Sequence, residues 1–324
     1  MMTLPILGID ISKTKFDAVL FHEGKYRHRV FSNKEQGFAK LREWLLQLGF
    51  ASVHACLEAT GTYGDPLARF LHQAGHHVSI VNPARIKAFA MSELSRTKTD
   101  KTDAYLIARF CFSQQPKLWT PPPLELTELQ ALVRRLENLQ DMHQQESNRL
   151  SSEILSKQVL QSVTTHLEYL DQEIQKTKKL IKNHIDQHPT LKNQRDLLTS
   201  IPGIADATAA KLLAELQNFK SYSSARQVAA YAGLTPQHHL SGSSVHRKAR
   251  LSKTGNTRLR KSLYMPAIVA KQHNPIIKTF CERLKERGKN NMTIIGAAMR
   301  KLLHIVYGVL KSGKPFNPNY QLAA

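Results

Sequence analysis

Apolar residues in the first quarter of the chain gather in short runs separated by polar ones. Runs typical of strands lie at 6–11, 16–21, 26–31, 53–57 and 78–81. Apolar residues at helical spacing lie between them, at 37–48 and 63–73. Strands that come first as a hairpin series and then alternate with helices predict a mixed α/β sheet.

The next region has a helical pattern over a much longer stretch. Residues 124–188 contain neither glycine nor proline, and Leu129, Leu132, Leu136 and Leu139 recur at intervals of three and four residues. Glu, Gln, Lys and Asn fill the other faces. This spacing predicts two long helices. They could form an antiparallel pair, a dimerising coiled coil, or an arm packed only within its own chain.

Prolines and composition divide the chain into three parts. Three consecutive prolines, Pro121 to Pro123, end the first region. The expected domains are 1–123 with the mixed sheet, 124–190 as a helical arm, and 191–324 as a mainly helical, basic domain. The apolar stretch from 292 to 310 is interrupted by two basic residues and a histidine, so it predicts an amphipathic or buried helix and no membrane span.

The charge of the chain is strongly positive and unevenly distributed. Lys and Arg number 46 against 25 Asp and Glu, a formal net charge of +21, and 41% hydrophobic residues exclude a disordered polyelectrolyte. Residues 216–324 hold 19 basic residues and two acidic ones. This asymmetry indicates a polyanionic partner, DNA or RNA in preference to an acidic membrane surface. Three cysteines without CxxC spacing predict a reducing cytoplasm and exclude a disulfide framework or zinc ribbon.

Four carboxylates carry the candidate chemistry. Asp10 closes the first strand in GIDISK, and Glu58 closes a later strand in CLEATGTYG. Asp100 and Asp103 lie in TDKTDA and share one helix face if a helix begins near Thr99. Strand ends project side chains to the sheet edge where α/β folds place their sites. Carboxylates that converge there repel one another unless a hard cation such as Mg²⁺ neutralises them, and two such ions would clamp the oxygens of a phosphodiester.

Each carboxylate alone has a simpler interpretation. An aspartate after a strand is often a turn or helix cap, and Asp100 could cap a helix in this way. Asp17 reads as a surface strand residue or part of a local pair. The order of strand with Asp, strand with Glu, and helix with Asp-x-x-Asp is more specific, because it resembles RNase H-like nuclease domains and the RuvC-type Holliday-junction resolvases.

Two motifs in the basic region indicate nucleic-acid contact. The turn at Pro202 and Gly203 in IPGIADATAA resembles a helix-hairpin-helix, whose backbone N–H groups grip phosphate; a plain helix connection is the alternative. The SGSS stretch from Ser241 to Ser244 could be a phosphate-gripping loop or carry a nucleophile. The expected nucleic-acid-binding residues are Pro202, Gly203, Arg247, Lys248, Arg250, Lys253, Arg258, Arg260 and Lys261.

Together these stretches resemble one family over nearly the whole chain, the DEDD-type insertion-sequence transposases guided by a bridge RNA. The motifs that carry the resemblance are GIDISK, CLEATGTYG, TDKTDA, IPGIADATAA, YAGLTP, SG-SS, SKTGN-RLRKSLYMPA and MRKLLHIVYGVLKSGKPF. The resemblance implies a RuvC-like N-terminal domain, a helical coiled-coil arm and a C-terminal transposase domain.

The resemblance also implies a mechanism and partners. Asp10, Glu58, Asp100 and Asp103 would bind Mg²⁺, and a serine of the C-terminal domain would join covalently to DNA. Ser241 is the assignment, with Ser243 and Ser244 as rivals. The partners implied are donor and target DNA, a noncoding bridge RNA and further copies of the chain, as a dimer and as a tetramer in the synaptic complex. The setting implied is the prokaryotic cytoplasm, at the nucleoid.

Three other functions compete with this prediction. A hydrolytic RuvC-like resolvase or nuclease needs the carboxylates but no serine. An actin-like sugar or acetate kinase shares a Gly-Ile-Asp strand but needs phosphate-binding glycine loops, which the sequence lacks. An architectural DNA-binding protein explains the charge but not the ordered carboxylates.

Overall fold

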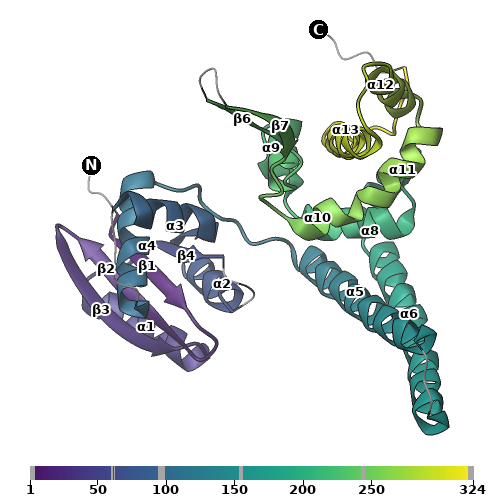
Figure 1. Cartoon of the computed structure of the whole chain (residues 1–324). Coiled ribbons are helices and arrows are strands. Elements are labelled where there is room, and N and C mark those ends of the chain that lie inside the picture. The colour runs from purple at the N-terminus through teal and green to yellow at the C-terminus, as the bar shows by residue number, and fades with distance from the viewer. Residues whose placement is uncertain are drawn as a thin grey trace. The chain divides into compact units, whose positions relative to one another are not determined.

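The computed structural model describes residues 4–59, 61, 63–93, 99–152, 156–241 and 245–319, and only the backbone of those that fall within 238–249. The chain forms two compact units, Met1–Pro121 (unit 1) and Pro122–Ala324 (unit 2). Each has its own hydrophobic interior (Figure 1).

Unit 1 is a five-stranded sheet covered by helices. The strands are β1 Ile6–Ile11, β2 Lys15–His22, β3 Lys25–Ser32, β4 His54–Glu58 and β5 His77–Val81, in the order β3-β2-β1-β4-β5. Pairs β1/β2 and β2/β3 are antiparallel, whereas β1/β4 and β4/β5 are parallel. The helices are α1 Glu35–Gln47, α2 Asp65–Gln73, α3 Pro83–Ser92 and α4 Asp100–Gln114. The predicted mixed α/β sheet is confirmed.

Alternate residues of each strand enter two different cores, because successive side chains point to opposite faces of a sheet. Leu7 and Ile9 of β1 pack with residues of α1 and α2. Ile6 of β1 and Cys56 of β4 pack with residues of α3 and α4 on the other face. The sheet is therefore the middle layer of three, with helices on both sides (Figure 1).

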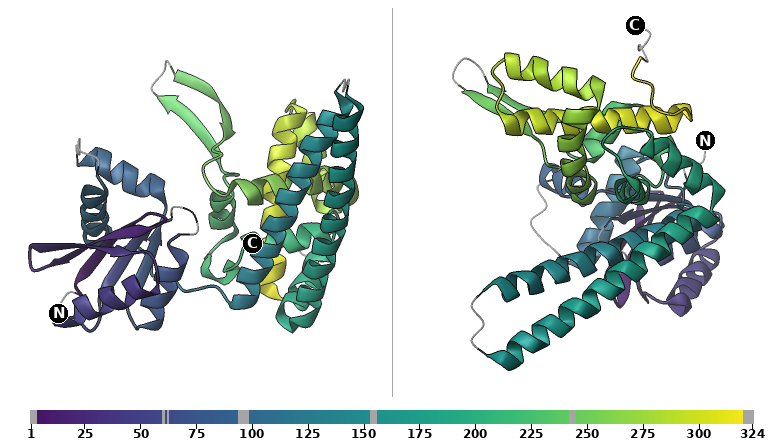
Figure 2. Two further views of the ribbon diagram at one scale, coloured as in Figure 1. Left: turned by 90° about the horizontal axis from the view of Figure 1, so that it is seen from below. Right: turned by 90° about the vertical axis from the view of Figure 1, so that its right-hand side faces the viewer.

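Unit 2 is mainly helical and has one continuous core. Its helices are α5 Leu124–Ser151, α6 Lys157–Gln187, α7 Pro189–Thr199, α8 Asp206–Glu215, a short 3₁₀ turn η1 Phe219–Ser221, α9 Ala225–Tyr231, α10 Thr257–Ser262, α11 Tyr264–His273, α12 Pro275–Glu286 and α13 Asn291–Ser312. Helices α5 and α6, the two long helices predicted from the leucine spacing, lie side by side as a hairpin (Figure 2). Leu129 and Ile174 of this pair belong to the same core as Leu302 of α13.

The apolar stretch near the C-terminus forms helix α13, which is long and apolar enough to cross a membrane by length and composition alone. Buried residues of α13, among them Leu302 and Val306, belong to the core of unit 2. The helix therefore packs as the buried helix that the sequence predicted.

One element of unit 2 was not expected from the sequence. Strands β6 Pro236–Ser241 and β7 Val245–Leu251 form an antiparallel two-stranded hairpin within a region predicted to be mainly helical. The sequence of these strands is rich in His, Arg and Lys and does not alternate cleanly between apolar and polar residues. The usual period-two signal of a half-buried strand is therefore weak here.

Candidate functional site

Three carboxylates lie on one face of the unit 1 sheet. Asp10 and Asp17 are cross-strand partners in β1 and β2. Asp10 lies two residues after Gly8, which faces helix α4, and Glu58 lies two residues after Cys56, which packs in the α4 core. Because side chains alternate along a strand, all three are placed on the side of the sheet that α4 covers.

Helix α4 brings two further carboxylates to this face. Its N-cap is Thr99, whose side chain accepts a hydrogen bond from the Thr102 backbone N–H while the Thr102 hydroxyl accepts one from the Thr99 N–H. Asp100 and Asp103 lie in the first turn that this capping box fixes. The helix thus begins where the sequence predicted, and Thr99, rather than Asp100, is the cap.

Backbone contact fixes α4 against β1. A Cβ atom added to Gly8 would lie 2.4 Å from the Ala104 carbonyl oxygen and 2.4 Å from the Ala108 nitrogen. Only a residue without a side chain allows this approach. The strand that carries Asp10 and the helix that carries Asp103 are therefore in direct backbone contact.

The electrostatics of Asp10 show that the predicted carboxylates converge. The pKa of Asp10 is raised to about 6, first by burial and then by the negative charges of Asp103, Asp100, Glu58 and Asp17. A like charge disfavours ionisation when it is close. The other three carboxylates predicted from the sequence therefore all act on Asp10.

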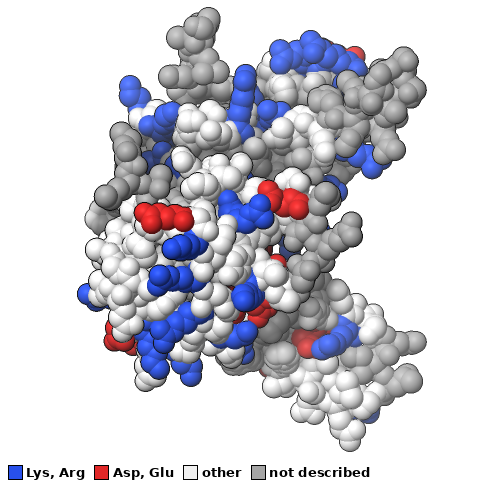
Figure 3. Space-filling view, turned by 90° about the vertical axis from the view of Figure 1, so that its left-hand side faces the viewer, with Lys and Arg blue, Asp and Glu red and all other residues white. Residues whose placement is uncertain are grey.

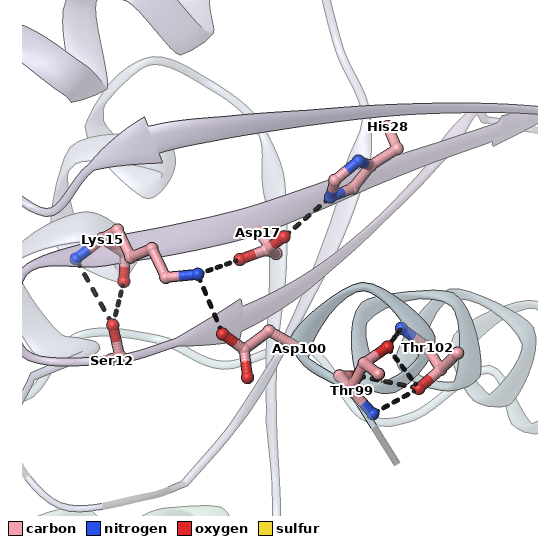
Figure 4. Close-up of polar contacts among 7 residues, drawn as sticks. All are labelled: Ser12, Lys15, Asp17, His28, Thr99, Asp100 and Thr102. Atoms are coloured by element: carbon pink, nitrogen blue, oxygen red, sulfur yellow. Dashed lines mark hydrogen bonds and ion pairs between the residues drawn. The ribbon is translucent and has the colours of Figure 1, made fainter. Parts of the chain in front are cut away.

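Lys15, Asp17 and His28 belong to the same site and were not predicted as functional residues (Figure 4). The Asp17 side chain is only 6% exposed, and His28 Nε2 lies 2.7 Å from its Oδ1. The earlier interpretation of Asp17 as a surface residue is wrong, because the carboxylate is buried; the alternative, a local pair, is confirmed. The burial follows from the strand register, which puts Asp17 opposite Asp10.

Lys15 connects the sheet to the helix. Its Nζ lies 2.9 Å from Asp100 Oδ2 and 3.5 Å from Asp17 Oδ2 (Figure 4). The hydrogen bond from Lys15 lowers the pKa of Asp100. A single ammonium group therefore offsets part of the negative charge that burial and crowding make costly.

The donor set fits a hard divalent cation in charge and in chemistry. The converging groups are all carboxylates, and oxygen ligands are those that Mg²⁺ prefers. Burial, followed by the negative charges of the neighbouring carboxylates, raises the pKa of Asp10. Among the residues that the structure describes, no three His, Cys, Asp or Glu side chains already stand together as a metal cluster. The carboxylates therefore fit Mg²⁺ in the type of their donor atoms and in their charge.

The predicted nucleophile lies in unit 2 at the end of a strand. Ser241 is the last residue of β6 and pairs with Val245 of β7. Its rivals Ser243 and Ser244 lie outside the described residues. The side chains of Arg247 and Lys248 are also outside the description, although their backbone belongs to β7.

Several of the predicted phosphate-contacting arginines and lysines have partners within unit 2. Arg258 Nη1 donates to Glu137 Oε2 of α5 at 2.6 Å, and Lys261 Nζ lies 3.9 Å from Asp141 Oδ1. The guanidinium of Arg260 donates to backbone carbonyls instead. Arg250 and Lys253 are exposed, and so are Arg258 and Lys261 despite their partners. Some of the basic side chains that the sequence predicts to bind nucleic acid therefore also make ion pairs or hydrogen bonds within unit 2.

The turn at Pro202 and Gly203 is packed against a helix. A Cβ atom on Gly203 would lie 2.8 Å from the Ala270 Cβ of α11. The Asn274 side chain donates to the Pro202 carbonyl oxygen at 3.4 Å. The close packing against Ala270 explains why a glycine stands at position 203. A phosphate-binding role for the turn stays a prediction.

Positive charge on the surface is dispersed. On the face drawn in Figure 3, the blue Lys and Arg side chains stand in several groups, some of them next to red acidic ones. Phosphate contacts that follow a backbone need charges spread along a path, not one dense spot.

Comparisons with known sequences match transposases and recombinase relatives over most of the chain. Residues 7–159 match the model of the DEDD transposases of IS110 elements, described as transposase, and residues 195–282 match a model described as transposase of the IS116/IS110/IS902 family. The chain is 36% identical over 319 residues to the pilin gene-inverting protein of Moraxella bovis, a match that covers 98% of each chain. It is 23% identical over 353 residues to the transposase for insertion sequence element IS1328 of Yersinia enterocolitica, covering 98% of this chain and 100% of the relative.

Proposed function

This chain belongs to the IS110 family of transposases and is a DNA transposase/recombinase, and from that premise we propose that it cuts and rejoins DNA with a serine nucleophile assisted by Mg²⁺. A bridge RNA chooses the donor and target sites by base pairing. The reaction takes place in the prokaryotic cytoplasm, at the nucleoid.

The observation that supports this proposal is the placement of Asp10 and Glu58 on the sheet face that α4 covers, with Asp100 and Asp103 in the first turn of α4; the negative charges of the other three contribute to the raised pKa of Asp10. The strand order β3-β2-β1-β4-β5, with three antiparallel strands followed by two parallel ones, is that of an RNase H-like domain. Bound by these four carboxylates, Mg²⁺ would act as a Lewis acid on a phosphodiester oxygen. Lys15 holds Asp100 toward the sheet.

The serine supplies the covalent step. Ser241 Oγ forms a bond to phosphorus while one P–O bond of the DNA backbone breaks, and the leaving oxygen takes up the proton that the serine loses. Each P–O bond of the DNA backbone that breaks is thus replaced by one ester bond between the serine and the same phosphorus. Rejoining then reverses the step with a different DNA end, so that neither ATP nor a polymerase is required.

Nucleic acid and further copies of the chain are the proposed partners. The +17 charge of residues 216–324 provides for contacts with DNA and RNA backbones. The helices α5 and α6 provide a long surface on which a dimer, and a tetramer in the synaptic complex, can assemble as a coiled coil. In such an assembly the carboxylates of one protomer act with the serine of another. The pilin gene-inverting name of a relative suits a recombinase that acts at two specific DNA sites.

A covalent protein–DNA adduct tests the proposal. With labelled substrate DNA, the bridge RNA and Mg²⁺, the wild-type chain should form an adduct that survives denaturation, and Ser241→Ala should form none while still binding DNA. Matched variants Ser243→Ala and Ser244→Ala should retain the adduct. An adduct with Ser241→Ala would pass the role to one of the other serines, and DNA cleavage by the wild type without any adduct would favour the hydrolytic resolvase.

Mixing experiments test the shared site. Ser241→Ala protein mixed with Asp10→Asn protein should recover partial strand cleavage, because some assemblies then contain one intact pair of carboxylates and serine. Cleavage by a strictly monomeric preparation would contradict a site shared between protomers.

A further inference from the structure

The β6–β7 hairpin depends on its two ends for its orientation. A two-stranded ribbon is at best marginally stable in water by itself. The chain enters the hairpin through residues 231–235 and leaves it through residues 252–256, and we call these two segments the hairpin roots. The direction in which the strands extend is set by what holds the roots.

Backbone hydrogen bonds join the two roots. The Ser252 N–H donates to the Thr235 carbonyl at 2.9 Å, and the Lys253 N–H donates to the Gly233 carbonyl at 3.1 Å. Further along, the Asn256 N–H donates to the Tyr231 carbonyl at 2.6 Å. The backbone hydrogen bonds that pair the two strands of the hairpin therefore continue beyond the strands into the hairpin roots.

One side chain, Arg260 of α10, is shared by both roots. Its Nη1 donates to the Ala232 carbonyl at 3.0 Å in the first root and to the Lys253 carbonyl at 3.1 Å in the second. Its Nη2 donates to Thr257 Oγ1 at 3.1 Å. The planar guanidinium thus uses several of its N–H donors on fixed acceptors within the protein.

A second polar contact anchors the roots to α8. The Asn256 side-chain amide donates to Glu215 Oε2 at 2.7 Å and lies 3.0 Å from the Tyr231 hydroxyl. Glu215 is buried at the end of α8, and Arg134 of α5 lies 3.8 Å from it. The orientation of the hairpin is therefore coupled to the core helices of unit 2.

Close packing leaves the roots little freedom to move. Gly233 has φ +69°, and a Cβ atom there would lie 2.5 Å from Arg260 Nη1. Leu251, at the end of β7, reaches to 3.1 Å from the Cβ position of Gly296 on α13. Three elements, α8, α10 and α13, thus hold the base of one ribbon.

From these contacts we propose that Arg260 is a positioning residue, which fixes the hairpin roots and so orients the strand that ends at Ser241, and that it is not a phosphate contact. This inference rests on the proposed role of Ser241. It reassigns a basic residue that the sequence places in the nucleic-acid-binding group. A nucleophile displaced by about 1 Å can lose about 10²-fold in rate, so the orientation of the ribbon has a direct kinetic consequence.

Charge-retaining and charge-removing variants distinguish positioning from phosphate contact. Arg260→Lys keeps the charge but cannot bridge both carbonyls with the geometry of a guanidinium. It should lower the rate of adduct formation by about 10²-fold. Arg260→Gln should do the same and should leave the salt dependence of DNA binding unchanged. The matched control Arg250→Gln changes an exposed residue of β7 and should instead lower the slope of log K against log salt by about 1.

A third variant disturbs the roots without removing any charge. Gly233→Ala places a methyl group against the guanidinium at a backbone conformation that favours glycine. It should reproduce the loss of adduct with wild-type DNA affinity. Wild-type adduct rates in Arg260→Lys, or a slope lowered by about 1 in Arg260→Gln, would overturn the proposal.

Amide hydrogen exchange separates this proposal from the proposed function. In Arg260→Lys and Gly233→Ala, the N–H groups of Lys253 and Asn256 should exchange faster than in the wild type, while helix α13 keeps its protection. If the wild type forms no adduct, the serine mechanism fails, and the exchange result still decides whether Arg260 holds the roots. Unchanged exchange at both amides would overturn the proposal in either case.

Discussion

The carboxylate face of unit 1 and the basic region of unit 2 differ in how their charged side chains are paired within the protein. In unit 1, three carboxylates of the sheet and two of helix α4 lie near one another, and burial, followed by the charges of the other four, raises the pKa of Asp10. In unit 2, arginines such as Arg258 and Arg260 are paired with carboxylates or carbonyls of the same chain. The difference teaches that the formal charge of a region does not show how much of that charge is already paired within the protein.

The two regions also differ in how they are held. The carboxylates lie on a sheet enclosed by two helical layers, with α4 in backbone contact with β1 at Gly8. The serine lies on a two-stranded ribbon joined to its unit at the roots. Substitutions in the carboxylate face should therefore change the rate of strand cleavage or the stability of unit 1. Substitutions in the basic region should change DNA binding or the orientation of the hairpin.

The largest effect is expected from the carboxylates. Asp10→Asn should lower strand cleavage by about 10³-fold or more, because it removes a charged oxygen ligand from the place where the carboxylates converge. DNA affinity, measured by filter binding or fluorescence anisotropy, should change little. The matched control Glu43→Gln, on the exposed side of α1, should cleave like the wild type. Wild-type cleavage by both Asp10→Asn and Asp103→Asn would show that the carboxylates of unit 1 are not needed for strand cleavage.

A smaller effect is expected from the contact between β1 and α4. Gly8→Ala should destabilise unit 1 by about 3 kcal/mol, because the new methyl group collides with helix backbone that cannot move aside alone. Both tryptophans, Trp44 and Trp119, lie in unit 1, so urea unfolding followed by tryptophan fluorescence reports on this unit.

The control for this measurement is another glycine of the same sheet. Gly24 has φ +75° and open space around its Cβ position, so Gly24→Ala should cost about 1 kcal/mol from backbone strain alone. Equal losses in the two variants would show that α4 does not rest on Gly8.

The smallest effect is expected from the basic residues of β7. Neutralising Arg247, Lys248 and Arg250 together should weaken DNA binding roughly tenfold at moderate salt and lower the salt slope by about 3. Arg258→Gln is the matched control, since its guanidinium is paired with Glu137, and it should leave the slope unchanged. A slope that falls by about 1 in Arg258→Gln would show that internal pairing does not remove an arginine from DNA binding.

Much of unit 1 could be predicted because its signals are local. The strands that became β1, β2, β4 and β5 are short apolar runs, and Thr99 marks the start of α4. The position of the carboxylates followed from strand ends. The burial of Asp17 could not be predicted in this way, because it depends on the register with Asp10 and on His28 in a third strand.

The basic region was harder to predict because its decisive contacts are distant in sequence. Arg258 and Glu137 are separated by 121 residues, and Asn256 and Glu215 by 41. A list of basic residues therefore mixes those available to DNA with those used for folding. The hairpin itself was missed because its strands carry charged and histidine residues where a half-buried strand would alternate.

The shared core of unit 2 has a consequence for the order of events during synthesis. Leu129 near its beginning packs in the same core as Leu310 near its end, whereas unit 1 closes its own cores within the first 121 residues. Domains fold as units from the N-terminus at about 5–20 residues per second of translation, so unit 1 has roughly 10–40 s to fold before unit 2 can be completed. On a nascent chain the carboxylate face therefore forms first. The β6–β7 hairpin becomes anchored only when helix α13 has left the ribosome, so a prematurely ended chain carries the carboxylate face without an anchored hairpin.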